Sequence, residues 1–224
     1  MTASARSEAP APASPAADPS WVALAVLAPV GAALVAVLRY VLPYETTDST
    51  ADMVREVYAD PDGMSLVLWL SLAAALTIVP GSVAIGRLVR AGAPRLTSVA
   101  LTLLVPAYLV LPMLAIVDHT IWSGAESGAS QSSVVALLES GHPMVAIATV
   151  VFVVGHVVGT VVLGAAMLRS RCVPAWAAVL TIVSQPLHFI AAVVVPNHAL
   201  DGLAWGLNAV GFAVAALAVA RAAR

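Results

Sequence analysis

Residues 143–196 read PMVAIATVVFVVGHVVGTVVLGAAMLRSRCVPAWAAVLTIVSQPLHFIAAVVVP, and this stretch decides the fold. It consists of two long apolar runs joined by a short turn at 169–174, with the sequence RSRCVP. Each run exceeds the roughly 20 residues that an α-helix needs to cross a bilayer. The stretch therefore predicts two antiparallel membrane-spanning helices joined by a tight turn.

Each run of this hairpin carries one histidine, His156 in GHVVG and His188 in SQPLHF. The two positions are equidistant from the middle of the turn, so antiparallel helices place them at one depth. At 1.5 Å per residue that depth is roughly 20–24 Å from the turn, inside a hydrocarbon layer about 30 Å thick. Two ionisable groups at one level within a bilayer indicate a functional site.

The composition of the whole chain agrees with a membrane protein. Of its 224 residues, 61% are hydrophobic and only 10% are charged, which is outside the usage of soluble domains. Six apolar runs are long enough to span: 21–43, 64–89, 96–117, 143–168, 174–196 and 202–221. We therefore expect an all-α, six-helix transmembrane bundle over 21–224 as a single domain, preceded by a disordered cytoplasmic tail at 1–20.

The composition also excludes several classes of function. The chain has no lysine, so a retinal-type Schiff base is impossible. Its single cysteine, Cys172, excludes an intramolecular disulfide. A net charge of −2 implies no attraction to nucleic acid, and the expected partner is the lipid bilayer.

Charged residues alternate between the connections. The connections after spans two and four and the C-terminus carry arginines: Arg87, Arg90, Arg95, Arg169, Arg171, Arg221 and Arg224. The other connections carry mostly carboxylates: Glu45, Asp48, Asp52, Glu56, Asp60, Asp62, Asp118, Glu126, Glu139 and Asp201. By the positive-inside rule, both termini are expected to be cytoplasmic in the cell inner (plasma) membrane.

The units 49–119 and 131–198 have similar layouts. Each contains a small-residue motif and a pair of prolines at the same separation: Gly81, Ser82, Gly86, Pro94 and Pro106 in the first, and Gly159, Thr160, Gly164, Pro174 and Pro186 in the second. A short amphipathic segment precedes each hairpin, at 49–58 and 131–139, and is expected to be a helix on the outer surface. The pattern predicts two parallel-repeat hairpins, although glycine and proline also recur in membrane helices for packing reasons alone.

Four side chains are candidates for a ligand or cofactor pocket: Arg39, Tyr108, His156 and His188. Two neutral imidazoles could hold a b-type haem. Alternatively, each histidine makes a structural hydrogen bond to a nearby polar side chain or to a carbonyl freed by a proline. Arg39 either snorkels to the interface, pairs with Asp118 or Asp201, or meets an anionic group of a ligand.

A second polar group gathers at the outer ends of the spans and includes His119, His142, His198 and Asp201. Imidazoles and carboxylates are ligands of zinc and similar divalent metals, so these residues are candidates for a metal site. Polar residues also accumulate at span ends simply because water begins there.

The run LRSRCVPAWAAVLTIVSQPLHF at 168–189, with GHVVGTVVLG at 155–164, resembles a stretch common in uncharacterised small multi-pass membrane proteins of actinobacteria. The resemblance covers about the last 80 residues. It implies about six helices and an actinobacterial origin, and it carries no catalytic residues.

Three classes of function stay open. The first, which we favour, is a protein that binds a small hydrophobic ligand or a cofactor in an outward-opening polar pocket between helices. The second is an integral-membrane enzyme acting on a lipid or isoprenoid, cyclase-like, with Asp118, His156 or His188 as catalytic candidates. The third is a small transporter or a subunit of a larger complex that associates through glycine-bearing faces. Whether the protein is an enzyme is left undecided.

Overall fold

The structure is a computed structural model and describes residues 20–223. Over this range the chain is helical without strands, and six helices are long and apolar enough to cross a membrane: α1 (Ser20–Val41), α3 (Pro61–Val89), α4 (Pro94–Ser127), α6 (Met144–Ser170), α7 (Ala175–Phe189) with its π-helical continuation η1 (Ile190–Val194), and α8 (His198–Ala222). The predicted all-α, six-helix bundle is confirmed. The predicted tail falls outside the described residues except for Ser20, which begins α1.

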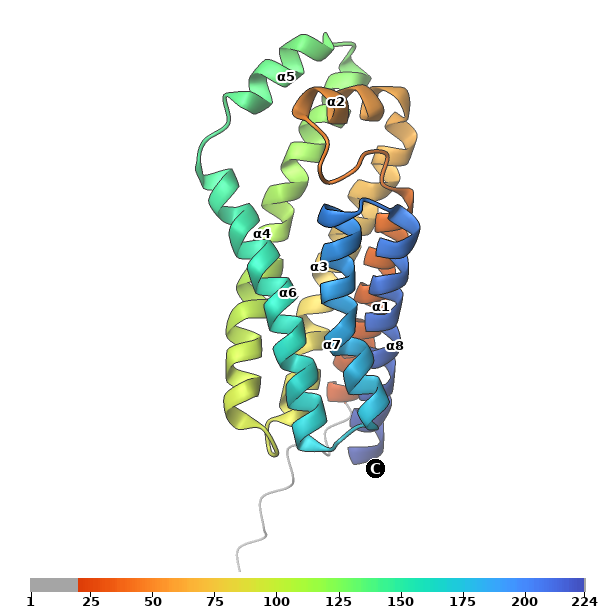
Figure 1. The fold of residues 1–224 in the computed structure, drawn as a ribbon, viewed down its shortest axis with the longest axis vertical. Helices are drawn as coiled ribbons and strands as arrows, with labels where there is room; N and C mark the ends of the chain where they lie inside the picture. Colours follow the sequence, from red (N-terminus) through yellow and green to blue (C-terminus); the bar gives the residue numbers. More distant parts are fainter. Residues whose placement is uncertain (1–19, 224) are drawn as a thin grey trace, which may run out of the picture.

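The six long helices form a closed ring in chain order. Each packs against the next one along the chain, and α8 returns to pack against α1 (Figure 1). Because the chain reverses direction at every connection, α1 begins at the same end of the bundle where α8 finishes (Figure 1). Helices from opposite ends of the sequence therefore meet on one side of the molecule.

Glycines allow neighbouring helices to approach closely. Gly81 of α3 lies against the backbone of Ala28 in α1, with no room for a side chain. A Cβ atom at Gly155 of α6 would lie 2.7 Å from the Cβ of Ala107 in α4. Such contacts hold the spans together by van der Waals packing, which is the main attraction available to helices surrounded by lipid.

Two short helices, α2 (Thr50–Ala59) and α5 (Gln131–Glu139), lie at the end of the bundle opposite the two chain ends and pack against each other (Figure 1). Ser49 and Ser130 cap their N-termini by accepting hydrogen bonds from backbone N–H groups. Below them lies a buried apolar cluster made of Leu42, Val54, Val57, Met64, Val67, Ile121 and Val134. The two predicted surface helices therefore cover this end of the bundle.

Two helix ends differ from the prediction. α4 continues to Ser127, ten residues beyond the expected end, because no proline follows Pro112 in this stretch and the helix ends only at Gly128, whose φ is 70°. Asp118 and His119 are therefore helical residues. In α7, the backbone after Pro186 changes to a π-helix, closed by a 2.8 Å hydrogen bond from the Val195 N–H to the Ile190 carbonyl. The duplication of the two hairpins stays a prediction.

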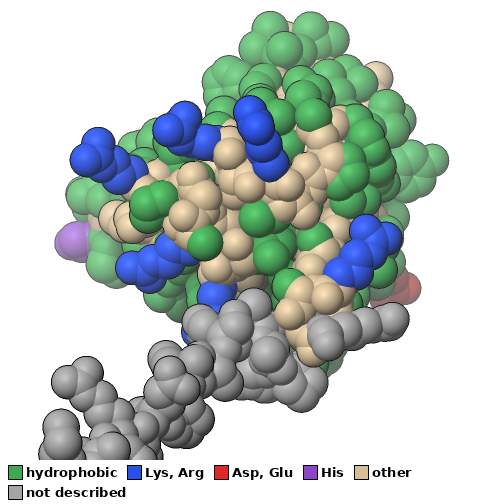
Figure 2. All heavy atoms as spheres, turned by 90° about the horizontal axis from the view of Figure 1, so that it is seen from below, with side chains coloured by type: hydrophobic (Ala, Val, Ile, Leu, Met, Phe, Trp, Pro, Cys, Tyr) green, Lys and Arg blue, Asp and Glu red, His purple; other side chains and the backbone are tan. Residues whose placement is uncertain are grey.

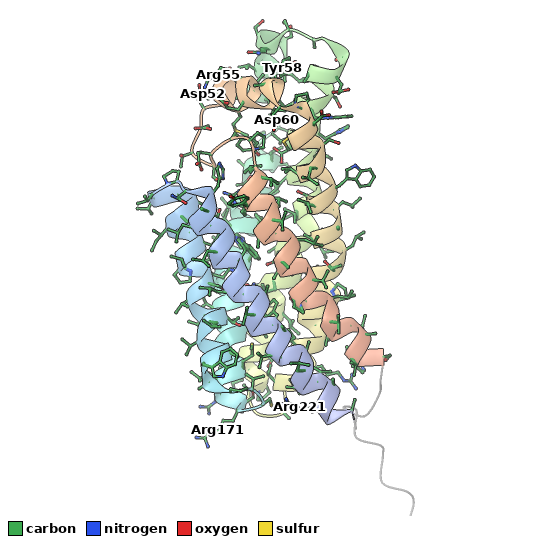
Figure 3. The ribbon with its side chains drawn as sticks, turned by 90° about the vertical axis from the view of Figure 1, so that its right-hand side faces the viewer. Asp52, Arg55, Tyr58, Asp60, Arg171 and Arg221 are labelled. Atoms are coloured by element: carbon green, nitrogen blue, oxygen red, sulfur yellow. The ribbon has the colours of Figure 1, made fainter. Side chains whose placement is uncertain are left out.

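Charges separate along the bundle axis. Arginines gather on the end that carries the α3–α4 and α6–α7 turns (Figure 2). Arg171 and Arg221 point outward there, whereas Asp52 and Asp60 lie at the opposite end, around α2 (Figure 3). We call these the arginine end and the acidic end.

Candidate functional site

His156 of α6 and His188 of α7 face each other inside the bundle. Their ring centroids are 5.3 Å apart, and His156 is only 2% exposed. Their equal spacing from the α6–α7 turn predicts this proximity, provided that both rings point inward. The helices rotate both side chains toward the bundle axis, which spares the imidazoles from facing hydrocarbon.

The hydrogen bond made by His156 fixes the state of its ring. Its Nδ1 lies 2.7 Å from the Phe152 carbonyl oxygen, which can only accept, so Nδ1 donates. In the neutral ring, Nε2 is then an acceptor. Nε2 is buried and has no hydrogen-bond partner among the described residues. An unpaired polar atom in the interior is costly, so this nitrogen is available to a donor that the protein does not supply.

Asp201 connects His188 to Arg39. One carboxylate oxygen lies 2.5 Å from His188 Nδ1, and the other accepts a 2.5 Å hydrogen bond from Arg39 Nε. Arg39 also donates to the Thr46 hydroxyl at 2.6 Å. Asp201 is 1% exposed, and it lies within the first turn of α8, where the unpaired N–H groups of a helix favour negative charge. The pairing with Asp201, one of the three sequence alternatives for Arg39, is the one found.

A second pair joins the α1–α2 connection to α4. The Tyr44 hydroxyl donates to Asp118 Oδ1 at 2.6 Å. Burial raises the pKa of Tyr44 well above its ordinary value of 10.0, and the nearby charge of Asp118 adds to the rise. Tyr44 therefore keeps its proton and acts as a donor at neutral pH.

Aromatic rings surround the two imidazoles. Phe152 stacks on His156 with 4.4 Å between centroids. The indole of Trp205 lies 5.9 Å from His156 and 5.4 Å from His188. Tyr108 of α4 lies 6.5 Å from His156 and reaches the same cluster. Four spanning helices, α4, α6, α7 and α8, thus contribute to one aromatic and imidazole group.

These residues line a cavity of about 330 Å³. All six spanning helices contribute to its wall, and Leu42, Tyr44, Thr46 and Met53 add to it from the α1–α2 connection and α2. Arg39, Tyr108, Asp118, His156 and His188 supply most of its polar groups. The chemistry available there is hydrogen bonding by imidazole, carboxylate, guanidinium and hydroxyl groups set among apolar side chains.

Buried polar groups continue one helical turn toward the arginine end. Thr160 follows His156 by one turn, Gln185 precedes His188 by one, and Asn208 follows Trp205 by one. Each is at most 1% exposed and carries at least one side-chain atom without a partner among the described residues.

The residues predicted to bind metal are not brought together. Among residues 20–223, no three His, Cys, Asp or Glu side chains form a group that could hold a metal ion. The four candidates have different partners: His119 stacks on Trp122, His142 accepts from the Met144 N–H, His198 lies 3.3 Å from Glu45, and Asp201 binds Arg39 and His188. His119 lies within α4, His142 in the α5–α6 connection, and His198 and Asp201 in the first turn of α8, so a similar expected depth did not bring the four side chains together.

The histidine pair, as arranged, does not fit the axial ligands of a haem. Metal–nitrogen bonds of about 2 Å on opposite faces of a porphyrin put two imidazole centroids about 6 Å apart, with the macrocycle between them. Here the separation is 5.3 Å, and Trp205 packs beside both rings.

Several residues of the site carry no clear signal in the sequence. Phe152 precedes His156 by four residues and Trp205 follows Asp201 by four, so helical spacing could have identified these two. Tyr44 and Thr46 lie in a connection without regular structure, where no periodicity indicates direction.

The chain was compared with known proteins. No curated protein and no solved structure matches it. The resemblance of its C-terminal part to actinobacterial proteins stays a prediction. A family model described as a domain of unknown function (DUF4386) matches residues 20–222, the whole ring of helices, and the chain belongs to this family.

Proposed function

We propose that this polytopic membrane protein binds a small, largely apolar molecule in its central cavity, with the polar group of the ligand among Arg39, Tyr108, His156 and His188. The observation that carries the proposal is that all four side chains line one cavity enclosed by six helices. A volume of about 330 Å³ lies at the lower end of the usual range for small-molecule sites.

The charges around the cavity indicate what kind of polar group it takes. The guanidinium of Arg39 is already matched by Asp201. Asp118 accepts from Tyr44, and no basic group of the described residues lies within 4.0 Å of it. His156 Nε2 is an unpaired acceptor on this wall and the Trp205 indole N–H is an unpaired donor, so the imbalance that a ligand meets is the negative charge of Asp118. A ligand that donates hydrogen bonds, such as an alcohol or an amine, fits better than a carboxylate.

A thermal-shift experiment tests this preference. The protein is placed in lipid nanodiscs, and its unfolding midpoint is measured with 1-decanol, decylamine or decanoate at equal concentration. We expect decanol to raise the midpoint, decylamine to raise it further because its ammonium group can pair with Asp118, and decanoate to leave it nearly unchanged. Asp118→Asn should remove the advantage of the amine over the alcohol, whereas the control His119→Gln, on the next residue of α4, should keep it. Equal shifts for all three compounds, unaltered by Asp118→Asn, would reject the proposal.

One observation favours a second candidate, an enzyme acting on a lipid. The carboxylate of Asp201 holds His188 through Nδ1, the arrangement that orients an imidazole as a general base. If the protein is such an enzyme, incubation with membrane lipids yields a new product by mass spectrometry, and His188→Gln abolishes it. Binding without turnover in the wild-type protein would leave only the first candidate.

We also propose that the arginine end faces the cytoplasm, with the cavity in the outer half of a plasma-membrane bundle. The gathering of arginines at one end supports this orientation (Figure 2).

A further inference from the structure

We propose that the cavity is reached sideways from the bilayer, between α3 and α4, and that the occupant is the hydrocarbon chain of a membrane-dissolved amphiphile. This inference rests on the proposed function and adds the source of the ligand and its route. Three features support it: an apolar groove on the outside of the bundle, a thin wall between this groove and the cavity, and a missing backbone hydrogen bond in α4 at that wall.

The groove lies between α3 and α4 and has a volume of about 230 Å³. Its lining is almost entirely apolar and includes Leu68, Leu72, Pro112 and Ile116. Leu72 is 47% exposed and Ile116 is 60% exposed, so the groove faces the surroundings of the bundle. The groove lies in the half of the bundle nearer the acidic end, where an exposed apolar face of a spanning helix meets lipid chains.

Three side chains line both the groove and the central cavity: Ser71 of α3, and Leu111 and Ala115 of α4. Each of these residues borders the groove on one side and the cavity on the other, so the wall between the two spaces is one residue thick here. Two of the three are small. Rotation of the Leu111 side chain, or a slight separation of α3 from α4, therefore joins the two spaces.

The backbone of α4 is weakened at the same place. Pro112 has no N–H and cannot donate to the carbonyl of Tyr108, which lies one turn earlier. Leu111 and Ala115 flank this missing hydrogen bond. The helix thus has less resistance to bending at the wall than elsewhere, and Tyr108 already lines the cavity.

The chemistry of the route selects the occupant. A charged, water-soluble ligand would lose its hydration at the groove, where the only polar side chains of the lining are the neutral Ser71 and, at the margin, His119. A hydrocarbon chain loses nothing by moving from lipid into an apolar groove. Its polar group would then reach Asp118 and His156 on the cavity side, where the proposed function places it.

Quenching of Trp205 by brominated lipid tests the route. Trp205 lines the cavity and is 2% exposed. The other four tryptophans (Trp21, Trp69, Trp122 and Trp176) are replaced by phenylalanine, and the protein is reconstituted in phosphatidylcholine with brominated acyl chains. We expect clear quenching of Trp205 relative to unbrominated lipid. Ala115→Phe, which thickens the wall, should reduce the quenching at least twofold.

The control is Val154→Phe, which places the same ring on an exposed position of α6 that lines neither space and should leave the quenching unchanged. Ser71→Leu thickens the wall from α3 and serves if Ala115→Phe does not fold. Absence of quenching, or equal quenching in the wall variants and the control, would overturn the route. If the wild-type protein binds decanol but the wall variants do not change the quenching, the route is rejected and the proposed function stands. If the wild-type protein does not bind decanol, both are rejected.

Discussion

The two halves of the bundle bring the same six helices together in different ways. Toward the arginine end, Gly81, Gly86, Gly164 and Gly211 each lie against the adjacent helix with no free space for a side chain. Toward the acidic end, the helices surround a cavity, and contacts such as Arg39–Asp201 and Tyr44–Asp118 link them instead. The packed half fixes the helix positions, so that the acidic half can hold polar groups around a space.

The orientation of the two ends gives the largest expected effect, an all-or-none difference in labelling. Cys172 is exposed at the arginine end, so the wild-type protein in intact cells should not react with a membrane-impermeant maleimide. In a Cys172→Ser background, Ser127→Cys at the acidic end should be labelled, whereas Ala91→Cys at the α3–α4 turn should be labelled only after permeabilisation. The reverse pattern would put the cavity in the cytoplasmic half.

A side chain added at a tightly packed glycine near the arginine end should disrupt the fold. In Gly81→Val, the new Cβ would collide with the backbone of Ala28, which cannot move aside as a side chain can. We expect a loss of folding stability greater than the roughly 1–3 kcal/mol of ordinary overpacking, seen as aggregation or a large fall in the unfolding midpoint.

Gly206→Ala is the control, because a Cβ there meets no atom within 4 Å. It should change stability by about 1 kcal/mol or less. Similar behaviour of both variants would show that close glycine packing does not hold this half together.

Removal of the Asp201 carboxylate should destabilise the acidic half of the bundle. Asp201→Asn keeps the shape of the side chain but leaves the part-buried Arg39 without a counter-charge. Breaking one partner of a buried ion pair costs about 3–5 kcal/mol, measurable by denaturant unfolding in mixed micelles. The double variant Arg39→Gln/Asp201→Asn should recover much of the loss, because no unpaired charge is left. A single-variant loss below about 1 kcal/mol would indicate that water reaches the pair freely.

Tyr44 gives the smallest effect, and it depends on pH. Tyr44→Phe removes one hydrogen bond to a carboxylate, worth about 1–3 kcal/mol at neutral pH. Because the pKa of Tyr44 is raised in the folded protein, its contribution is complete below pH 10 and falls as the pH rises further. Wild-type stability should therefore decline more steeply above pH 10 than that of Tyr44→Phe. Parallel curves for the two proteins would contradict the burial of this phenol.

Much of the fold could be predicted from the sequence, because six apolar runs and alternating charges are strong signals in a bilayer. The spacing of His156 and His188 from one turn predicted their common depth. The direction of side chains around each helix was less accessible: His119, His142 and His198 share a level with Asp201 but point to other partners. Tyr44 could not be predicted at all, because its position depends on a connection whose path is set by α2 and α4.

The closure of the ring has a consequence for biogenesis. Of these six spans, α1 leaves the ribosome first and α8, which covers one of its faces, leaves last. Until α8 inserts, that face of α1 lies against lipid or the insertion machinery. Arg39 spends the same interval without Asp201, so its charge must reach the interfacial water. The insertion of α8 thus both completes the ring and neutralises a charge that entered the membrane with α1.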